Sequence, residues 1–201
     1  MPSVNNKSVF AIVLAAGSAT RFGKVKQLAA LNGIPMVRYA GRLAIGACDS
    51  RSVLVTGHEW RAVADACAPW PGYLLVNEHY SNGIGSSLAV ATRAIQHVAD
   101  AIVVLLADQP LISPAHVNSL IAAWSGDDCE IVASAYAGTR GVPALFARGA
   151  FTSLAALTGD QGARALFDDP RFAVRDIACE DAAIDIDTVA DLRTLERNAR
   201  S

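Results

Sequence analysis

Residues 13–28 read Val-Leu-Ala-Ala-Gly-Ser-Ala-Thr-Arg-Phe-Gly-Lys-Val-Lys-Gln-Leu. The apolar run at the start of this stretch stops abruptly at small residues before Gly17. A strand that ends in a small-residue loop leaves backbone N–H groups free to point at one anion. Arg21, Lys24 and Lys26 add positive charge to the same loop. The stretch therefore predicts a strand followed by a loop that binds a polyphosphate.

Two commoner phosphate-binding loops do not fit these residues. A P-loop requires Gly, four residues and then Gly-Lys-Ser/Thr, whereas five residues separate Gly17 from Gly23 here, and Val25 follows the lysine. A dinucleotide-binding fingerprint requires three glycines in the pattern G-x-G-x-x-G, and Ala19 stands where the second glycine belongs. The plain alternative is an ordinary strand-to-helix connection with a solvated basic face.

Composition narrows the class of protein. The chain is 52% hydrophobic and 18% charged, so it can bury a sizeable core. The net charge of −2 provides no global basic field for nucleic acid or a membrane surface, and no apolar run approaches the ~18 residues of a membrane span. The four cysteines are far apart and favour buried thiols in a reducing compartment. We expect a cytoplasmic protein that binds neither nucleic acid nor membranes.

Apolar, β-branched segments alternate with segments of helical periodicity. The expected strands are residues 9–14, 52–56, 73–76, 101–106 and 131–136, and the expected helices are residues 36–47, 59–68, 86–98 and 114–124. This alternation predicts an α/β fold with a mostly parallel sheet and helices on both faces. Ligands of such sheets bind beyond the carboxyl ends of the strands. We expect a single domain over 1–201, with a nucleotide-binding half at 9–110 and an acceptor-binding half at 111–201.

Acidic residues at two places are candidate metal ligands. Asp108 comes just after the apolar strand 101–106, where its carboxylate faces the ligand crevice. Mg²⁺ takes one or two protein carboxylates together with phosphate oxygens, and it neutralises charge on a transferring phosphoryl group. Asp185 and Asp187 alternate on an expected short strand before Thr188, which is an expected helix N-cap. Turn formation and helix capping are the alternative roles for these acids.

The segment 77–88 is a candidate base-binding loop. Gly85 allows the backbone to approach a planar base, and Ser86 and Ser87 can bond to the base or the ribose. Helix N-capping by Ser86 is the alternative role.

The segment 159–164 reads Gly-Asp-Gln-Gly-Ala-Arg and joins two expected helices. Arg164 then lies in the first turn of a helix, where a cation is unfavourable unless an anion is near. This motivates a role for Arg164 in holding the phosphate of an acceptor. A glycine-broken turn with a surface arginine is the alternative.

The motifs together resemble those of MobA/MocA-type nucleotidyltransferases, over residues 9–195. The matching segments are Leu14-Ala15-Ala16-Gly17, Arg21-Phe22-Gly23, Lys26-Gln27-Leu28, Asp108-Gln109-Pro110, the Gly-x-x-Ser-Ser-Leu that ends at Leu88, and 159–164. The last three are typical of the MocA-like branch. The resemblance implies a Rossmann-like domain of the nucleotide-diphospho-sugar transferase type.

The resemblance also implies roles for individual residues. Catalytic roles fall on Arg21, Lys26 and Asp108, and the metal site on Asp108 and Asp187, with Asp185 as the weaker choice. Acceptor binding falls on Asp160 and Arg164. The nucleotide-binding set is Leu14, Ala15, Ala16, Gly17, Arg21, Lys26, Gly85, Ser86 and Ser87.

The implied reaction moves CMP from CTP to a phosphate acceptor with Mg²⁺ as cofactor and pyrophosphate as the leaving product. The implied acceptor is molybdenum-loaded molybdopterin, the product is its cytosine dinucleotide, and the recipient is a molybdenum hydroxylase. Ala16 and the pair Ser86-Ser87 favour CTP over GTP, because the guanosine-using branch carries Gly-Gly where this chain has Ala16-Gly17. No general base is required, because a phosphate monoester is already ionised near neutral pH.

Three alternatives remain open from the sequence. One is a nucleotidyltransferase whose acceptor is a sugar phosphate or another phosphate. Another is a guanylyltransferase that uses GTP. The last is a non-catalytic accessory protein that binds a nucleotide or a pterin, against which the pair Asp108 and Asp187 weighs, since pure binding does not need two metal carboxylates.

Overall fold

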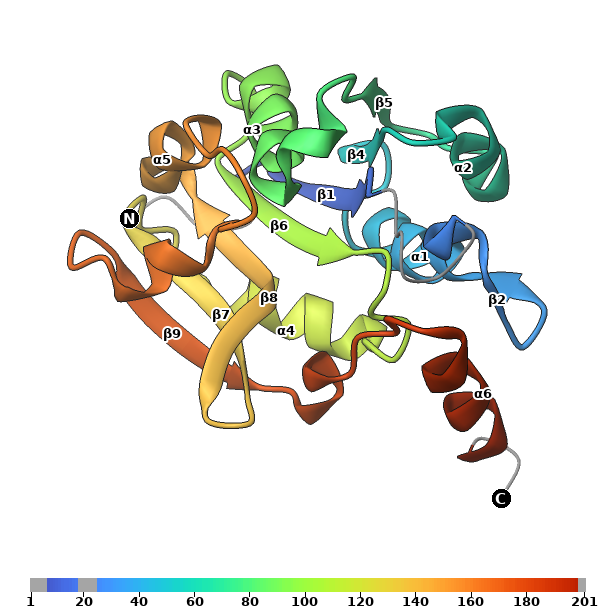
Figure 1. Ribbon diagram of the computed structural model, residues 1–201. Helices are drawn as coiled ribbons and strands as arrows, with labels where there is room; N and C mark the ends of the chain where they lie inside the picture. The colour runs from blue at the N-terminus through green and yellow to red at the C-terminus, as the bar shows by residue number, and fades with distance from the viewer. Residues whose placement is uncertain (1–6, 18–24, 199–201) are drawn as a thin grey trace.

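The computed structural model describes residues 7–17 and 25–198 and contains a seven-stranded sheet at its centre (Figure 1). The sheet strands are β1 (Val9–Ala15), β4 (Ser52–Thr56), β5 (Tyr73–Val76), β6 (Ala101–Leu106), β7 (Glu130–Tyr136), β8 (Thr139–Ala147) and β9 (Ala173–Ala178). A separate small hairpin pairs β2 (Ala30–Leu31) with β3 (Ile34–Pro35).

The order of the strands is β5-β4-β1-β6-β8-β7-β9. β1 pairs in parallel with both β4 and β6, and β7 pairs in parallel with β9. β8 runs antiparallel to its two neighbours, so it alone opposes the direction of the other strands of this sheet. The prediction of a mostly parallel α/β sheet is confirmed.

Helices cover both faces of the sheet (Figure 1). The α-helices are α1 (Met36–Cys48), α2 (Trp60–Cys67), α3 (Ile84–Ile95), α4 (Pro114–Ala123), α5 (Phe151–Ala155) and α6 (Val189–Asn198). The short 3-10 helices are η3 (Lys26–Leu28), η4 (Tyr80–Asn82), η5 (Arg148–Ala150), η6 (Arg164–Asp168) and η7 (Glu180–Ala183).

Side-chain alternation along β1 divides the core into two layers. Val9, Ala11, Val13 and Ala15 pack with α1, α2 and α4 on one face. The intervening residues of β1 pack with α3, α5 and η6 on the other face. All seven residues of β1 are buried, which explains why this strand is apolar throughout.

The expected strands 52–56, 73–76 and 101–106 match β4, β5 and β6, and the other expected elements up to residue 136 are correct within three residues at each end. β8 and β9 were not expected. Gly138 lies in the turn between β7 and β8, whereas Gly141 and Pro143 belong to β8 itself. Gly141 and Pro143 are residue types that normally end strands, so the sequence pattern did not predict β8.

The C-terminal segment returns to the N-terminal half of the molecule. Ile186 and Leu192 form a small core with Leu31 and Met36. Residues 184–188, expected to include a short strand, lie outside the sheet, so that expectation is wrong. Thr188 lies just before α6 and accepts a hydrogen bond from the Asp191 N–H, as an N-cap does (3.2 Å).

Two of the cysteines behave as expected and one does not. Cys48 and Cys67 are buried, and burial raises the pKa of each thiol to about 11. Cys129 is exposed, so the expectation of buried thiols is wrong there. Within residues 7–17 and 25–198, no helix combines the length and the apolarity needed to cross a membrane.

A buried polar group holds β7, β8 and α4 together. The register of β7 against β8 shifts between Ala133 and Ser134, which marks a β-bulge. The fully buried Ser134 hydroxyl donates to the Pro143 carbonyl at 2.5 Å and lies 2.7 Å from His116 Nε2. The Pro143 carbonyl of β8 and the His116 imidazole of α4 therefore both depend on the Ser134 hydroxyl.

Ser134→Ala should lower the free energy of unfolding by about 1–3 kcal/mol, because it leaves the Pro143 carbonyl and the His116 imidazole without this partner in the core. The measurement is equilibrium unfolding in urea. Ser119→Ala is the matched control, since the exposed Ser119 hydroxyl bonds only to its own helix. Equal effects of the two substitutions would contradict this account of the bulge.

Candidate active site

A cluster of one lysine and two aspartates lies at the carboxyl edge of the sheet. Lys26 Nζ is 2.8 Å from Asp108 Oδ2 and 2.6 Å from Asp187 Oδ1. Asp108 follows β6, Asp187 precedes α6, and Lys26 begins η3. The fold thus brings together three predicted residues that are 82 and 161 positions apart in the sequence.

Burial and charge act in opposite directions on Lys26. Only 9% of this residue is exposed. Burial alone would lower the pKa of its ammonium, but the charge of Asp108 and the hydrogen bonds to Asp108 and Asp187 outweigh burial, so the pKa is raised. Lys26 is therefore held as a cation between the two carboxylates.

The donor set fits a divalent metal ion. Asp108 Oδ1 is buried and has no hydrogen-bond partner in the described part of the chain. A buried carboxylate oxygen without a partner is costly unless a ligand satisfies it. Hard divalent cations such as Mg²⁺ take one or two protein carboxylates and fill the remaining positions with phosphate oxygens and water. Asp108 and Asp187, already bridged by a cation, meet that requirement.

Backbone contacts fix the position of Asp187. The Ile186 N–H donates to the Asp108 carbonyl at 3.0 Å, which joins the C-terminal segment to the end of β6. The buried Ile186 side chain anchors the segment beneath. Asp191 accepts hydrogen bonds from the N–H groups of Asp187 (3.1 Å) and Thr188 (2.7 Å). These contacts leave the Asp187 carboxylate directed to Lys26.

Asp185 lies beside this cluster but does not pair with Lys26. Partial desolvation raises the pKa of its carboxyl, and the negative charges of Asp108 and Asp187 add to the rise, while Gln109 and Lys26 oppose it. Asp185 also faces Tyr136 at the end of β7. Burial raises the pKa of the Tyr136 phenol, the Asp185 charge adds to the rise, and Arg164 opposes it.

The end of β1, where nucleotide binding was predicted, lies at the same edge of the sheet. Ala16 is buried and its carbonyl accepts a hydrogen bond from the His58 N–H. The Gln27 side chain donates to the Gly17 carbonyl at 2.7 Å, which ties η3 to the first loop. Leu14 and Ala15 are strand residues of the buried core. Arg21 and Lys24 lie outside the described residues.

Asn77 organises the candidate base-binding loop. Its amide donates to the hydroxyls of Ser86 and Ser87, at 2.9 Å in each case. Ser86 was expected as a possible N-cap of the helix, and this is wrong, because α3 begins at Ile84 and Gly83 is its N-cap. Asn77 was not identified from the sequence, although its position directly after β5 is the signal that could have found it.

The segment that contains Asp160 packs against this loop. The Gly85 N–H donates to the Gly159 carbonyl at 2.9 Å. A side chain at Gly83 would place its Cβ 2.4 Å from Asp160 Oδ1, and the φ of +88° at Gly83 also favours glycine. Asp160 therefore contacts the start of α3. It faces the candidate base-binding loop and not the residues around Arg164.

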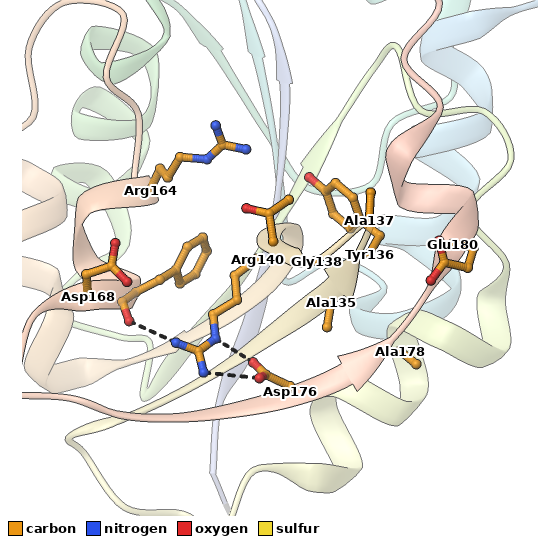
Figure 2. A pocket seen from close by; sticks show the side chains of 12 residues that line it. Ala135, Tyr136, Ala137, Gly138, Arg140, Arg164, Asp168, Asp176, Ala178 and Glu180 are labelled. Carbon is orange, nitrogen blue, oxygen red and sulfur yellow. Dashed lines mark hydrogen bonds and ion pairs between the residues drawn. The ribbon is translucent and has the colours of Figure 1, made fainter.

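Arg164 lines a pocket of about 660 Å³ at the other end of the same edge (Figure 2). The lining residues come from the β7–β8 turn, η6, β9 and η7. Figure 2 shows the Arg164 side chain reaching towards Tyr136 and away from the paired Arg140 and Asp176. The structure thus separates the two residues that were grouped as acceptor-binding, Asp160 and Arg164.

A comparison with protein families matches residues 11–175 to the MobA-like NTP transferase domain. A relative called nicotine blue oxidoreductase, from Paenarthrobacter nicotinovorans, is 31% identical over 199 residues, which cover 93% of this chain and 96% of the relative.

Solved structures give the same fold. Rv0371c of Mycobacterium tuberculosis superposes with a TM-score of 0.81 at 32% identity, covering 94% of this chain and 98% of that one. The same protein has been solved in complex with manganese, with a TM-score of 0.78. A 4-diphosphocytidyl-2C-methyl-D-erythritol synthase from Anaerococcus prevotii, at 14% identity and a TM-score of 0.78, covers 98% of both chains and shares the nucleotide-diphospho-sugar transferase fold. The chain belongs to the MobA-like NTP transferase family.

Proposed function

We propose that this protein transfers CMP from CTP to the phosphate of molybdenum-loaded molybdopterin, with release of pyrophosphate. The observation that carries the proposal is the cluster of Lys26, Asp108 and Asp187 at the carboxyl edge of the sheet, beside the end of β1. A binding protein has no need for a lysine held between two carboxylates at this edge. Phosphoryl chemistry needs cations and metal-binding oxygens there.

Asp108 and Asp187 would hold a divalent metal ion, for which we propose Mg²⁺. The bound ion would supply charge neutralisation on the phosphates. The relative Rv0371c has been solved in complex with manganese, which supports a divalent cation as the partner of this protein. Lys26, beside these carboxylates, would neutralise negative charge on the triphosphate together with Arg21.

The remaining residues orient the two substrates. The loop that starts at Gly17 cradles the triphosphate, and the Asn77–Ser86–Ser87 hydrogen bonds hold the base-binding loop in one conformation. Arg164 attracts the acceptor phosphate, which is already ionised near neutral pH and needs no general base. Catalysis then comes from positioning and from charge neutralisation.

Different residues support the proposed nucleotide and the proposed acceptor. CTP is favoured by Ala16 and by the Ser86-Ser87 pair, which resemble the cytidine-using branch. The molybdopterin acceptor and the molybdenum hydroxylase as recipient rest on the MocA-like segments at 108–110 and 159–164. The name of the Paenarthrobacter relative raises a redox activity as a competing function, and the lysine–carboxylate cluster favours nucleotidyl transfer over it.

The first test is pyrophosphate release by the purified protein with Mg²⁺ and each nucleoside triphosphate. The proposal expects release that requires both CTP and molybdenum-loaded molybdopterin. Release that requires GTP would correct the base alone, and release with a sugar phosphate would correct the acceptor. Absence of release with every nucleotide and acceptor would contradict a transferase function.

Asp108→Asn should reduce pyrophosphate release about 100-fold or more, because several kcal/mol of charge stabilisation at the phosphates depends on the metal carboxylates. The variant should stay folded by circular dichroism, since Asp108 lies after β6 rather than in the core. Asp128→Asn is the matched control, because Asp128 is an exposed carboxylate whose only ion pair is with Lys7 in the described chain. Near-native release by Asp108→Asn would remove Asp108 from the site.

Lys26→Met should bind Mn²⁺ about tenfold more tightly than the wild type when no nucleotide is present, because no ammonium competes for the two carboxylates. With CTP added, the same variant should bind the nucleotide more weakly. Titration of Mn²⁺ by electron paramagnetic resonance measures the first effect. Lys7→Met is the control, and unchanged Mn²⁺ affinity in Lys26→Met would show that lysine and metal do not share a site.

A further inference from the structure

The pocket beside Arg164 has the size of a small-molecule site. Its volume of about 660 Å³ falls within the range of roughly 300–1,000 Å³ found for ligand pockets. Phe167 and Tyr136 give it apolar surface, Arg140 and Arg164 are its basic residues, and its acidic residues are Asp168, Asp176 and Glu180 (Figure 2). Asp176 pairs with Arg140, so the positive charge that this lining offers to an anionic group lies at Arg164.

The pocket opens at the same edge of the sheet as the carboxylate cluster. Tyr136 is the last residue of β7, and only β8 separates β7 from β6, which carries Asp108 just beyond its end. Asp185 interacts electrostatically with both Tyr136 and Asp108. A ligand in the pocket therefore lies next to the proposed metal site.

The lack of a side chain at Gly141 leaves room for the Tyr136 ring. A Cβ at Gly141 would lie 2.0 Å from the Tyr136 hydroxyl oxygen and 2.8 Å from the ring carbon that bears it. The tyrosine thus crosses β8 at a position that only glycine leaves free. The bulge that begins at Ser134 shifts the register of β7 against β8 and brings Gly141 to this place.

The two arginines of the pocket differ in what they bind. Arg140 forms a bidentate pair with Asp176 (2.7 and 3.1 Å), and it donates to the Phe167 carbonyl at 3.4 Å. Arg140 therefore already has partners within the wall of the pocket. Arg164 is exposed and forms no ion pair with a carboxylate in the described part of the chain, and its guanidinium reaches towards Tyr136 (Figure 2).

We propose that Tyr136 is an acceptor-binding residue whose hydroxyl, together with the Arg164 guanidinium, binds a phosphate monoester at the mouth of this pocket. The inference deepens the proposed transfer reaction and rests on it for the identity of the second substrate. The phosphate would enter beside Asp185 and meet the carboxylate cluster, while the body of the acceptor would fill the space between Phe167 and the β7–β8 turn.

Calorimetric titration of the whole protein tests this directly, with Mg²⁺ and a non-hydrolysable CTP analogue present throughout. Two phosphate monoesters are titrated in separate arms, a phosphorylated pterin and a hexose 1-phosphate, and each is compared with its unphosphorylated counterpart. We expect one of the two esters to bind. Tyr136→Phe should weaken that binding about tenfold, the loss expected for a hydrogen bond to a charged group.

A second substitution and several controls separate this role of Tyr136 from a structural one. Tyr136→Phe should leave the affinity for the CTP analogue and for the unphosphorylated ligand unchanged, and Tyr73→Phe on the opposite sheet edge should change nothing. Gly141→Ala should weaken ester binding by displacing the ring. Gly46→Ala, in α1, is its matched control, because a Cβ there meets nothing within 4 Å.

Equal ester affinity in Tyr136→Phe and the wild type would overturn the inference, and so would a wild type that binds neither ester. These readouts do not depend on turnover. If ester binding behaves as expected but no pyrophosphate is released, the proposed transfer reaction fails and the phosphate site stands.

Discussion

The ammonium group of Lys26 between Asp108 and Asp187 is the contact on which the rest of the site depends. It joins the first loop, the end of β6 and the C-terminal segment, and these lie far apart in the sequence. Without a cation at this point, two carboxylates would face each other at short range, and their repulsion would favour an open C-terminal segment. Lys26 therefore acts as an internal counter-ion for the two carboxylates, and it competes for them with a metal ion.

The sheet fixes where Asp108 lies and so where this contact forms. Apart from β8, its strands end at one edge, so residues that follow β1, β5, β6 and β7 line a continuous path from Gly17 to Tyr136. The antiparallel β8 lies between β6 and β7 and so separates Asp108 from Tyr136 by one strand. Its bulge against β7 is held by the hydrogen bond from the Ser134 hydroxyl to the Pro143 carbonyl. Nucleotide and acceptor would thus meet at Asp108, near the middle of the edge.

The sequence predicted the parallel half of the fold well, because β1, β4 and β6 are apolar runs bounded by turns and buried on both faces. β8 was not predicted because it contains Gly141 and, at its bulge, Pro143, and both residue types normally weaken or end strands. Asp108 and Asp187 were found from their places after a strand and before a helix. Asn77 and Tyr136 were not, since their roles come from partners nine or more residues away, Ser86 and Asp185, which only the folded chain brings near.

The most direct measurement is the crystal structure of the protein with Mn²⁺ and a non-hydrolysable CTP analogue, with the metal located by its anomalous scattering. The account predicts one manganese peak bridging Asp108 and Asp187, with Lys26 Nζ moved from between them to the phosphates of the nucleotide. Manganese bound elsewhere, with Lys26 still paired to both aspartates, would contradict it.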